Sequence, residues 1–431
     1  MLYALFRWPV RLLLLFFFRR IHRIGVDHVP KNKAVLFISN HSNAFMDPIL
    51  IASFQEREIY FWARAQEFKQ PIYNWILKNL HILPIYRIRD GRKLMNKNRQ
   101  TFASSKQLLA QNKAMYIAPE GNCTVEKRMR RFKLGTARLI LEIMEEKGWD
   151  FELEVVPVGL NYTYHTKFRS EVYMQFGAPI KVDSYQELSV NDRTKAVRAL
   201  TNELEDGLRS QLIIVKDKAD DELAEQILLL YRNSNTQSYW PIIADNERWC
   251  HDEQKLATWI NTLAPAEKET LKQRLDQYYK KLERAKITDR ALAQQNKPAL
   301  GNFVKLALGW PVFLVGIVGG WLPMQLARMT RNKMVKDIQF WAGVALVWGW
   351  IYWAVYSLVL VVALVIMWSW WALLLPVGLI AAQYLALEYQ EIWKAVSEDT
   401  IYQKWSKGHS KQNRVLKKER EAIIKGLGDY S

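Results

Sequence analysis

Apolar residues in the first half of the chain occur in short runs that alternate with stretches of helical periodicity. Helical patterns cover 66–80, 92–112 and 133–147, and the last one ends at Lys147-Gly148, a typical helix stop. The runs have the composition of strands: AVLFIS (34–39), EIYFWA (58–63), ILPIY (82–86), MYIA (115–118), LEVVPVGL (153–160) and EVYMQFG (171–177). Strands alternating with helices predict an α/β domain over 26–210, with a largely parallel sheet and flanking helices.

Strand patterns are missing between about 184 and 297, where apolar positions follow a helical period. The clearest stretches are 221–232 and 265–286, and Pro265 suits the first position of a helix. We therefore predict a helical region over 211–302. The simplest interpretation of this region is a packing or spacer subdomain.

Two long uncharged tracts follow the helical region. Residues 306–327 carry no charge but contain four glycines and two prolines, and 338–387 carry no charge over 50 residues. At about 1.5 Å per residue, the second tract is far longer than a bilayer core of about 30 Å. We therefore predict two transmembrane helices over 338–388, with their turn near 368–371. For 303–327 we predict a re-entrant or interfacial helical pair, because its glycines and prolines interrupt the tract.

The N-terminal segment 1–25 is apolar but too short to span a bilayer. Its longest uninterrupted apolar run is Leu12 to Phe18, against about 20 residues for a spanning helix. No small-residue cleavage site follows, which argues against a signal peptide. We predict an interfacial membrane helix over 1–25; the alternative is a buried amphipathic helix of the α/β domain.

Charge and cysteine content restrict the partners and the compartment. The net charge of +18 suits anionic headgroups, phosphorylated substrates or nucleic acid, and the apolar tracts favour lipid. Basic residues are spread out and no nucleic-acid-binding module is recognisable, so we expect no nucleic-acid partner. The two cysteines, Cys123 and Cys250, have no ligand-type spacing, which favours a reducing compartment.

Basic residues also flank the second tract on both sides. Arg328, Arg331, Lys333 and Lys336 precede it, and the tail from 404 to 425 holds eight Lys or Arg against two Glu. The positive-inside rule therefore predicts that the tract is a hairpin with both ends, and the catalytic domain, in the cytoplasm. We predict a basic cytoplasmic tail over 389–431, either a patch for anionic lipid or a solvated tail.

The first strand is followed by a segment that carries candidate chemistry, Asn40-His41-Ser42-Asn43-Ala44-Phe45-Met46-Asp47-Pro48. A carboxylate near a histidine can fix the imidazole tautomer and stabilise the imidazolium, which makes His41 a candidate base and Asp47 its orienter. Asp47-Pro48 is also a helix-start signature, which leaves a purely structural interpretation open.

Further polar residues follow the ends of other predicted strands. Arg87 follows one of them, and Pro119-Glu120-Gly121 follows the strand at 115–118. Lys133 and Gly135 then open a helix, whose N-terminus suits a phosphate. Because ligands bind at strand ends in α/β sheets, these points and the Val156-Pro157-Val158-Gly159 strand are expected to converge on one site.

These four blocks resemble, in order, those of the glycerolipid acyltransferase family, which includes glycerol-3-phosphate and lysophosphatidate acyltransferases. The family has an Asn-His…Asp segment, a strand ending in Arg, a Pro-Glu-Gly segment and a Val-Pro-Val/Ile-Gly strand, and the resemblance covers 34–160, about 40% of the chain. Five residues separate His41 from Asp47, where the family usually has four. This spacing resembles that of a subgroup seen in fungal glycerol-3-phosphate/dihydroxyacetone-phosphate acyltransferases. Cys123 replaces an arginine common in bacterial relatives.

The resemblance implies an O-acyltransferase that moves a fatty acyl group from acyl-CoA or acyl-carrier protein to glycerol 3-phosphate or 1-acylglycerol 3-phosphate. His41 and Asp47 would be catalytic, and no metal or tightly bound cofactor is expected. Cys123 as a covalent nucleophile is a minor alternative. The residues expected to bind substrate are Asn40, Arg87, Pro119, Glu120, Gly121, Lys133 and Gly135.

We expect membrane lipids, the thioester donor and the glycerol-phosphate acceptor as partners. Three alternatives to this function stay open: an acyltransferase for another lysolipid, a non-catalytic lipid-binding protein with the same fold, and a transporter. The transporter is disfavoured because the apolar tracts carry no internal charge and show no repeat.

Overall fold

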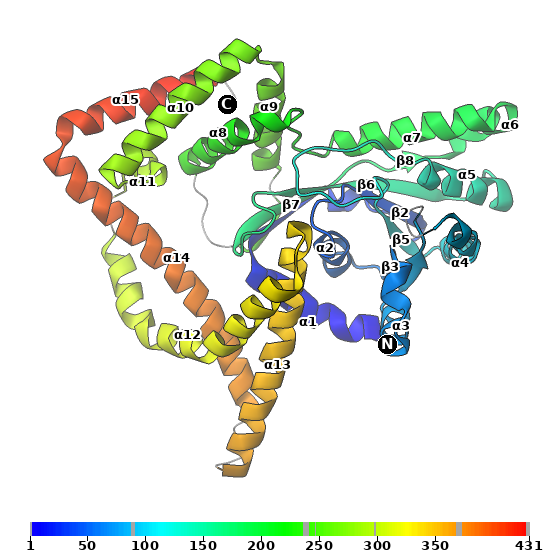
Figure 1. Cartoon of the computed structure of the whole chain (residues 1–431), viewed down its shortest axis with the longest axis horizontal. Coiled ribbons are helices and arrows are strands. Elements are labelled where there is room, and N and C mark those ends of the chain that lie inside the picture. The colour runs from blue at the N-terminus through cyan, green and yellow to red at the C-terminus, as the bar shows by residue number, and fades with distance from the viewer. Residues whose placement is uncertain are drawn as a thin grey trace. The chain divides into compact units, whose positions relative to one another are not determined.

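A computed structural model of the chain describes residues 2–87, 91–235, 241–245, 247–296, 299–367 and 373–427, without the side chains of 92 and 367. Contacts divide the chain into two compact units. The first comprises Met1–Ile214, Tyr239–Cys250 and Asp337–Gly343, and the second comprises Val215–Ser238, His251–Lys336 and Val344–Ser431. Each unit is described separately (Figure 1).

The first unit is built on a nine-stranded mixed sheet in the order β4-β3-β5-β2-β6-β7-β1-β9, with β8 paired to β6. The strands from β4 to β6 are parallel, whereas β7 pairs with β6 in the antiparallel sense. β1 and β9 then continue parallel to β7. The strands are β1 (Phe18–Ile24), β2 (Ala34–Ser39), β3 (Ile59–Arg64), β4 (Ile82–Ile85), β5 (Ala114–Ile117), β6 (Leu153–Tyr162), β7 (Ser170–Phe176), β8 (Ile180–Lys181) and β9 (Ile243–Ala244).

Helices flank this sheet, as the alternating pattern predicts. They are α1 (Leu2–Phe17), α2 (Met46–Phe54), α3 (Pro71–Asn79), α4 (Asn98–Ala110), α5 (Gly135–Lys147), α6 (Gln186–Asn191) and α7 (Arg193–Arg209), with single turns η1 (Val26–His28), η2 (Ala65–Phe68), η4 (Arg92–Lys97) and η5 (Asp183–Tyr185). α5 and α7 supply apolar residues to the core under β2, β5 and β6. Every residue of β2 is buried, because this strand is central in the sheet and both its faces are covered. The predicted fold class is confirmed, and so are the six predicted strands.

The N-terminal segment differs from its prediction. Only Leu2–Phe17 is helical, and residues 18–24 form β1, so a single interfacial helix over 1–25 is wrong. Phe18 and Ile21 are fully buried in the sheet, where β1 lies between β7 and β9. α1 buries Leu14 and Phe17 but exposes Leu5 and Trp8, so one face packs on the domain and another apolar face is open. Its membrane role stays a prediction.

The second unit is helical. It contains η6 (Lys218–Asp220), α8 (Asp221–Ser234), α10 (Pro265–Ala285), α11 (Asp289–Gln294), α12 (Leu300–Met334), α14 (Leu375–Gly408) and α15 (Ser410–Gly426), together with most of α9 (Arg248–Thr262) and of α13 (Trp341–Met367). Pro265 stands at the start of α10, as predicted. One buried cluster joins α8, α9, α10 and α11 to the end of α14 and to α15.

The C-terminal segment is therefore part of this core and not a solvated tail. Leu416 and Ile423 of α15 are buried in the cluster, and Tyr402 of α14 joins them. Arg420 is also buried and donates from Nε to Asp289 Oδ1 at 2.8 Å. The basic composition of 389–431 concealed an amphipathic helix whose apolar face closes the helical unit.

The tract at 306–327 is one continuous helix, α12, so the predicted helical pair is wrong. Pro311 and Pro323 lie inside it, and the helix bends along its length in Figure 1. α12 packs against α14, where a Cβ at Gly316 would meet the Ala382 carbonyl oxygen at 2.3 Å, a spacing that only glycine allows. Phe313 stacks on Tyr389 at 4.5 Å between ring centroids. Packing against α14 thus offsets the helix-breaking residues. Whether this segment is re-entrant or interfacial stays a prediction.

The region 338–388 contains two helices, as predicted, namely α13 and the first part of α14. The predicted turn at 368–371 lies outside the described residues. Among the described helices, α12 and the stretch Ile338–Ile366 are long and apolar enough to cross a membrane. Only 6% of the most apolar window in Ile338–Ile366 is buried in the structure, so this helix is not the core of a soluble fold.

Candidate active site

His41 and Asp47 meet in the segment that connects β2 to α2. His41 Nδ1 lies 2.9 Å from Asp47 Oδ2, and the two side chains are 24% and 0% exposed. Because Nδ1 is held by the carboxylate, Nε2 is the ring nitrogen left for a ligand. The predicted pairing of these two residues is present in the structure, and their catalytic role stays a prediction.

The carboxylate of Asp47 accepts two further hydrogen bonds. The Asn43 backbone N–H donates to Oδ2 at 2.9 Å, and the Tyr162 hydroxyl donates to Oδ1 at 2.7 Å. α2 begins at Met46 with Phe45 as its N-cap, so Asp47 is not the cap that the structural alternative required. Asp47 therefore orients His41 and is itself held by two donors.

Tyr162 is a site residue that the sequence did not single out. It is buried at the carboxyl end of β6, which neighbours β2. Burial, and then the Asp47 charge, holds the pKa of Tyr162 well above its usual range. The hydroxyl therefore stays protonated and serves as a donor to Asp47. Its position shortly after the Val-Pro-Val-Gly block was the available signal.

Glu120 is buried behind His41. The backbone N–H groups of His41 and Arg130 donate to its carboxyl group, yet burial raises the pKa of Glu120 to about 8. Its Oε1 atom is buried and has no hydrogen-bond partner in the described part of the chain. An unpaired buried carboxyl oxygen is costly. With a pKa of about 8 the group is mostly protonated at pH 7, so it is suited to donate a hydrogen bond to a substrate oxygen.

The rest of the Pro-Glu-Gly segment lies against the start of α5. Lys133 donates its backbone N–H to the Pro119 oxygen at 2.9 Å. Gly121 has a φ of +71°, a backbone conformation that favours glycine, and a Cβ there would lie 3.5 Å from Lys133 Cγ. Gly135 begins α5 beside open space. The structure thus brings together four of the predicted substrate-binding residues. They include the cation Lys133 and the first residue of α5, Gly135.

Asn40 and Arg87 are placed differently. Asn40 uses both ends of its amide on Leu160, donating to the oxygen at 2.9 Å and accepting from the N–H at 2.9 Å. Its side chain therefore ties β2 to β6 and does not point at a ligand, contrary to our expectation. Arg87 follows β4, at the same sheet edge as His41 but three strands away. At about 4.8 Å per strand the two strands are roughly 14 Å apart, and the role of Arg87 in binding an acceptor stays a prediction.

Cys123 contacts the segment that carries His41. Its sulfur accepts the Ala44 N–H at 3.1 Å, and burial together with the Asp47 charge raises the pKa of this thiol to about 12. A thiol with so high a pKa is a poor nucleophile at neutral pH, which argues against a covalent intermediate on Cys123. The charge of Arg64, at the end of β3, also acts on this thiol. No motif in the sequence marked Arg64 as a site residue.

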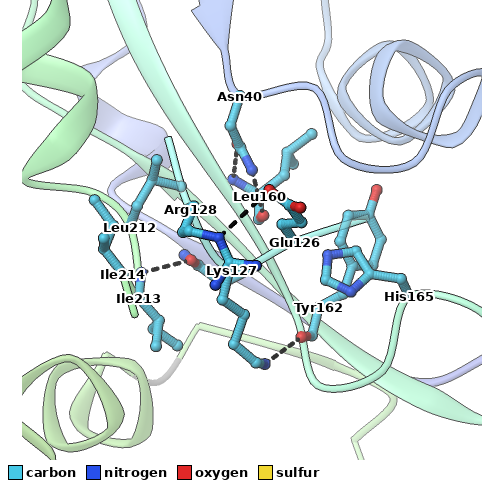
Figure 2. A pocket seen from close by; sticks show the side chains of 11 residues that line it. Asn40, Glu126, Lys127, Arg128, Leu160, Tyr162, His165, Leu212, Ile213 and Ile214 are labelled. Carbon is cyan, nitrogen blue, oxygen red and sulfur yellow. Dashed lines mark hydrogen bonds and ion pairs between the residues drawn. The ribbon is translucent and has the colours of Figure 1, made fainter. Parts of the chain in front are cut away.

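A small hollow of about 20 Å³ lies beside the segment that carries Asn40 and His41 and is drawn in Figure 2. The residues that line it include Asn40, Lys127, Tyr162 and His165. Lys127 Nζ donates to the backbone carbonyl oxygen of Tyr162 at 3.1 Å. His165 is held through its own carbonyl oxygen, which accepts from Asn43 Nδ2 at 2.8 Å. Burial lowers the pKa of His165 to about 4, so it is neutral at pH 7. Lys127 and His165 thus hold Tyr162 and Asn43, the two residues that donate to Asp47.

Among the described residues, no group of three or more His, Cys, Asp or Glu is arranged to hold a metal ion. The predictions of a metal-free reaction and of no tightly bound cofactor stay predictions.

Comparison with known proteins agrees with this geometry. The family model described as Acyltransferase matches residues 20–161, from β1 to β6. Glycerol-3-phosphate O-acyltransferase 1 of Saccharomyces cerevisiae is 30% identical over 146 residues, which cover 32% of this chain and 19% of that protein. Residues 20–161 are thus similar to an acyltransferase family, and we call this stretch the acyltransferase domain. It contains His41, Asp47, Arg87 and Glu120.

Two other proteins are similar to the acyltransferase domain. An uncharacterised acyltransferase of Schizosaccharomyces pombe is 26% identical over 142 residues, covering 32% of this chain and 21% of that protein. The chain thus spans about a fifth of the length of either yeast relative. The crystal structure of a 1-acyl-sn-glycerophosphate acyltransferase from Thermotoga maritima is 21% identical and covers 45% of this chain and 75% of its own, with a TM-score of 0.29.

Proposed function

We propose that the chain is an O-acyltransferase that transfers a fatty acyl group from a thioester to the hydroxyl of glycerol 3-phosphate or 1-acylglycerol 3-phosphate. The donor would be acyl-CoA or acyl-carrier protein. The observation that carries this proposal is the hydrogen-bonded series Tyr162–Asp47–His41, in which two buried groups orient one accessible imidazole.

In this mechanism His41 Nε2 accepts the proton of the acceptor hydroxyl while its oxygen attacks the thioester carbon. The buried Asp47 carboxylate stabilises the imidazolium that forms. The C–S bond then breaks, and His41 returns the proton to the leaving thiolate. The acyl group passes directly to the acceptor, and Cys123 takes no part in the transfer.

The acceptor would bind through its charged and hydroxyl groups. Lys133 and the N-terminus of α5 are suited to a phosphate, and Arg87 offers a guanidinium at the same sheet edge. The unpaired Oε1 of the protonated Glu120 would form a hydrogen bond with a second hydroxyl. Glycerol 3-phosphate has both a phosphate and a free secondary hydroxyl, and the S. cerevisiae relative is named for this acceptor.

Membrane anchoring would follow from the apolar helices. Residues such as Val355, Leu358, Val362 and Ile366 of α13 are exposed, and an apolar surface of this extent requires a cover. A bilayer supplies that cover and keeps the lipidic substrates near the site. The basic residues that precede α13 would place the acyltransferase domain on the cytoplasmic face.

The test is an acyl-transfer assay of the detergent-solubilised full-length chain. The acceptors are glycerol 3-phosphate, 1-acylglycerol 3-phosphate and lysolipids without a terminal phosphate, each with acyl-CoA and acyl-carrier-protein donors. We expect transfer to a glycerol-phosphate acceptor and its loss in His41→Ala. Full activity of His41→Ala would refute the mechanism. Preference for a lysolipid without a phosphomonoester would refute the acceptor.

A further inference from the structure

The seven residues Asp337–Gly343 lie far from the acyltransferase motifs in sequence but belong to the same compact unit. They comprise the single turn η7 (Ile338–Phe340) and the first residues of α13. Ala342 is only 2% exposed, so the segment is packed on the domain. The acyltransferase unit is therefore completed by a segment that the family match at 20–161 does not include.

This segment contacts the loop that carries His41 and Asp47. The rings of Phe45 and Phe340 lie 5.6 Å apart between centroids. A Cβ at Gly343 would lie 3.3 Å from Phe45 Cβ, closer than side chains usually pack. Phe45 stands four residues after His41, and its side chain is 42% exposed.

The position of Phe45 is fixed from within the loop. The preceding Ala44 has a φ of +36°, which is strained for a residue other than glycine. The Ala44 N–H donates to Cys123 Sγ. Met46, the residue after Phe45, donates its N–H to the Asn43 backbone oxygen at 2.7 Å. These contacts hold the loop in a conformation that exposes the Phe45 ring, and strain at such a position is typical of functional sites.

Polar and apolar groups are separated around this loop. The guanidinium carbon of Arg64 lies 5.3 Å from the Phe340 ring centroid, which indicates a cation–π contact. Arg64, Glu120 and Lys133 supply polar groups at the strand ends, whereas Phe45 and Phe340 supply two neighbouring rings. Phe340 thus lies between a cation and an exposed apolar ring. A substrate with a polar end and a hydrocarbon chain fits this arrangement.

We propose that Phe45 and Phe340 form an apolar wall beside His41 that binds the fatty acyl chain next to the thioester carbon. Segment 337–343 thereby sets the enzyme's preference for acyl chains. The inference rests on the proposed acyl transfer and adds residues that bind the acyl end of the donor. The same segment continues along the chain into α13, which we propose to be embedded in the membrane.

The first test measures kcat/KM of the full-length enzyme for acyl-CoA donors of increasing chain length. Phe340→Ala and Phe45→Ala should each lower kcat/KM for long-chain donors about tenfold, while the shortest donors change little, because each buried methylene contributes to binding. Val190→Ala is the control, since Val190 is an exposed apolar residue of α6, outside the segment 337–343. An unchanged chain-length profile in both phenylalanine variants, with activity retained, would overturn the proposal.

The second test does not depend on turnover. A long-chain acyl-CoA carrying a diazirine near its carboxyl end is photolysed with the wild-type chain, and the labelled peptides are identified by mass spectrometry. Label in the peptides that contain Phe45 and Phe340 is expected, and label confined to other peptides would overturn the inference. Inactivity of the wild type combined with this labelling would refute the proposed transfer but leave the acyl-binding wall standing.

Discussion

The two units each contain a buried aspartate that accepts a tyrosine hydroxyl, and the two clusters differ in what completes them. In the first unit, Tyr162 and His41 hold Asp47, and the imidazole is partly exposed. In the second, Tyr278 donates to Asp289 Oδ1 at 2.5 Å, and Arg420 donates to the same oxygen at 2.8 Å. Arg420 is itself buried, and Asn233 donates to the remaining oxygen.

The difference separates the arrangement that we propose to be catalytic from a structural one. A titratable imidazole at the surface can exchange a proton with a substrate, whereas a permanently charged guanidinium in the interior cannot. Both aspartates are buried and hydrogen-bonded, so burial alone does not identify a functional acid. The useful criterion is whether the cluster ends in an accessible group that can change its protonation state.

Asp47→Asn should have the largest effect on activity. The amide keeps the shape of the carboxylate but removes the charge that stabilises imidazolium, so kcat should fall by about 10³-fold. Acyl-transfer kinetics measure this change. The melting temperature should change far less than the activity, and loss of folding would contradict a mainly catalytic role for Asp47. Asp150→Asn serves as control because Asp150 lies in an exposed turn.

Arg420→Ala should show the opposite pattern. Its removal leaves the buried Asp289 charge without its cation, which costs about 3–5 kcal/mol in the free energy of unfolding. Thermal or denaturant unfolding in detergent measures this loss. Lys418→Ala, at an exposed position of the same helix, should have little effect. A variant of Arg420 with full stability would show that the cluster does not support the fold.

Glu120 should make stability depend on pH. Its pKa is raised to about 8 in the folded chain, chiefly by burial, so the folded state binds a proton that the unfolded state releases above about pH 4.5. Stability is therefore fully present below pH 4.5 and falls as the pH rises towards 8. Glu120→Gln should flatten this dependence and be the more stable form at pH 9, as measured by melting temperature at pH 5, 7 and 9. A parallel dependence in Glu120→Gln would assign it to other groups.

Tyr162→Phe should have the smallest effect of the four. It removes one hydrogen bond to the Asp47 carboxylate, for which a loss of about tenfold in kcat is expected. KM for the acceptor should stay nearly unchanged, because Tyr162 acts through Asp47. Tyr116→Phe is the matched control, since the Tyr116 hydroxyl pairs with Ser39 at 2.9 Å instead. Equal effects of the two variants would mean that Tyr162 has no special role at Asp47.

The sequence predicted the regular part of the acyltransferase domain well. Central parallel strands are buried on both faces, so they appear as short continuous apolar runs such as 34–39, which became β2. The pairing of His41 with Asp47 was predictable because both lie in one short segment. Tyr162 and Phe340 were not predictable, since they reach the site only through strand order and through the packing of a distant segment.

Predictions from composition were wrong where tertiary contacts determine the structure. The segment 18–24 contains three arginines and a histidine, yet it forms a strand inside the sheet because its apolar residues face the core. The tail around Arg420 is strongly basic, yet one face of its helix packs on α8 and α10. Glycines and prolines in α12 predicted a break, but close packing on α14 preserves the helix.

The sheet of the acyltransferase unit has a consequence for how the protein is made. β1, formed by residues 18–24, pairs on its outer edge with Ile243–Ala244, and the loop with His41 is covered by Asp337–Gly343. A ribosome releases these partners long after the motif residues have emerged. During synthesis the nascent domain therefore has an unpaired strand edge and an uncovered Phe45 until α12 has been translated. Completion of the first unit is in this way coupled to delivery of the apolar helices.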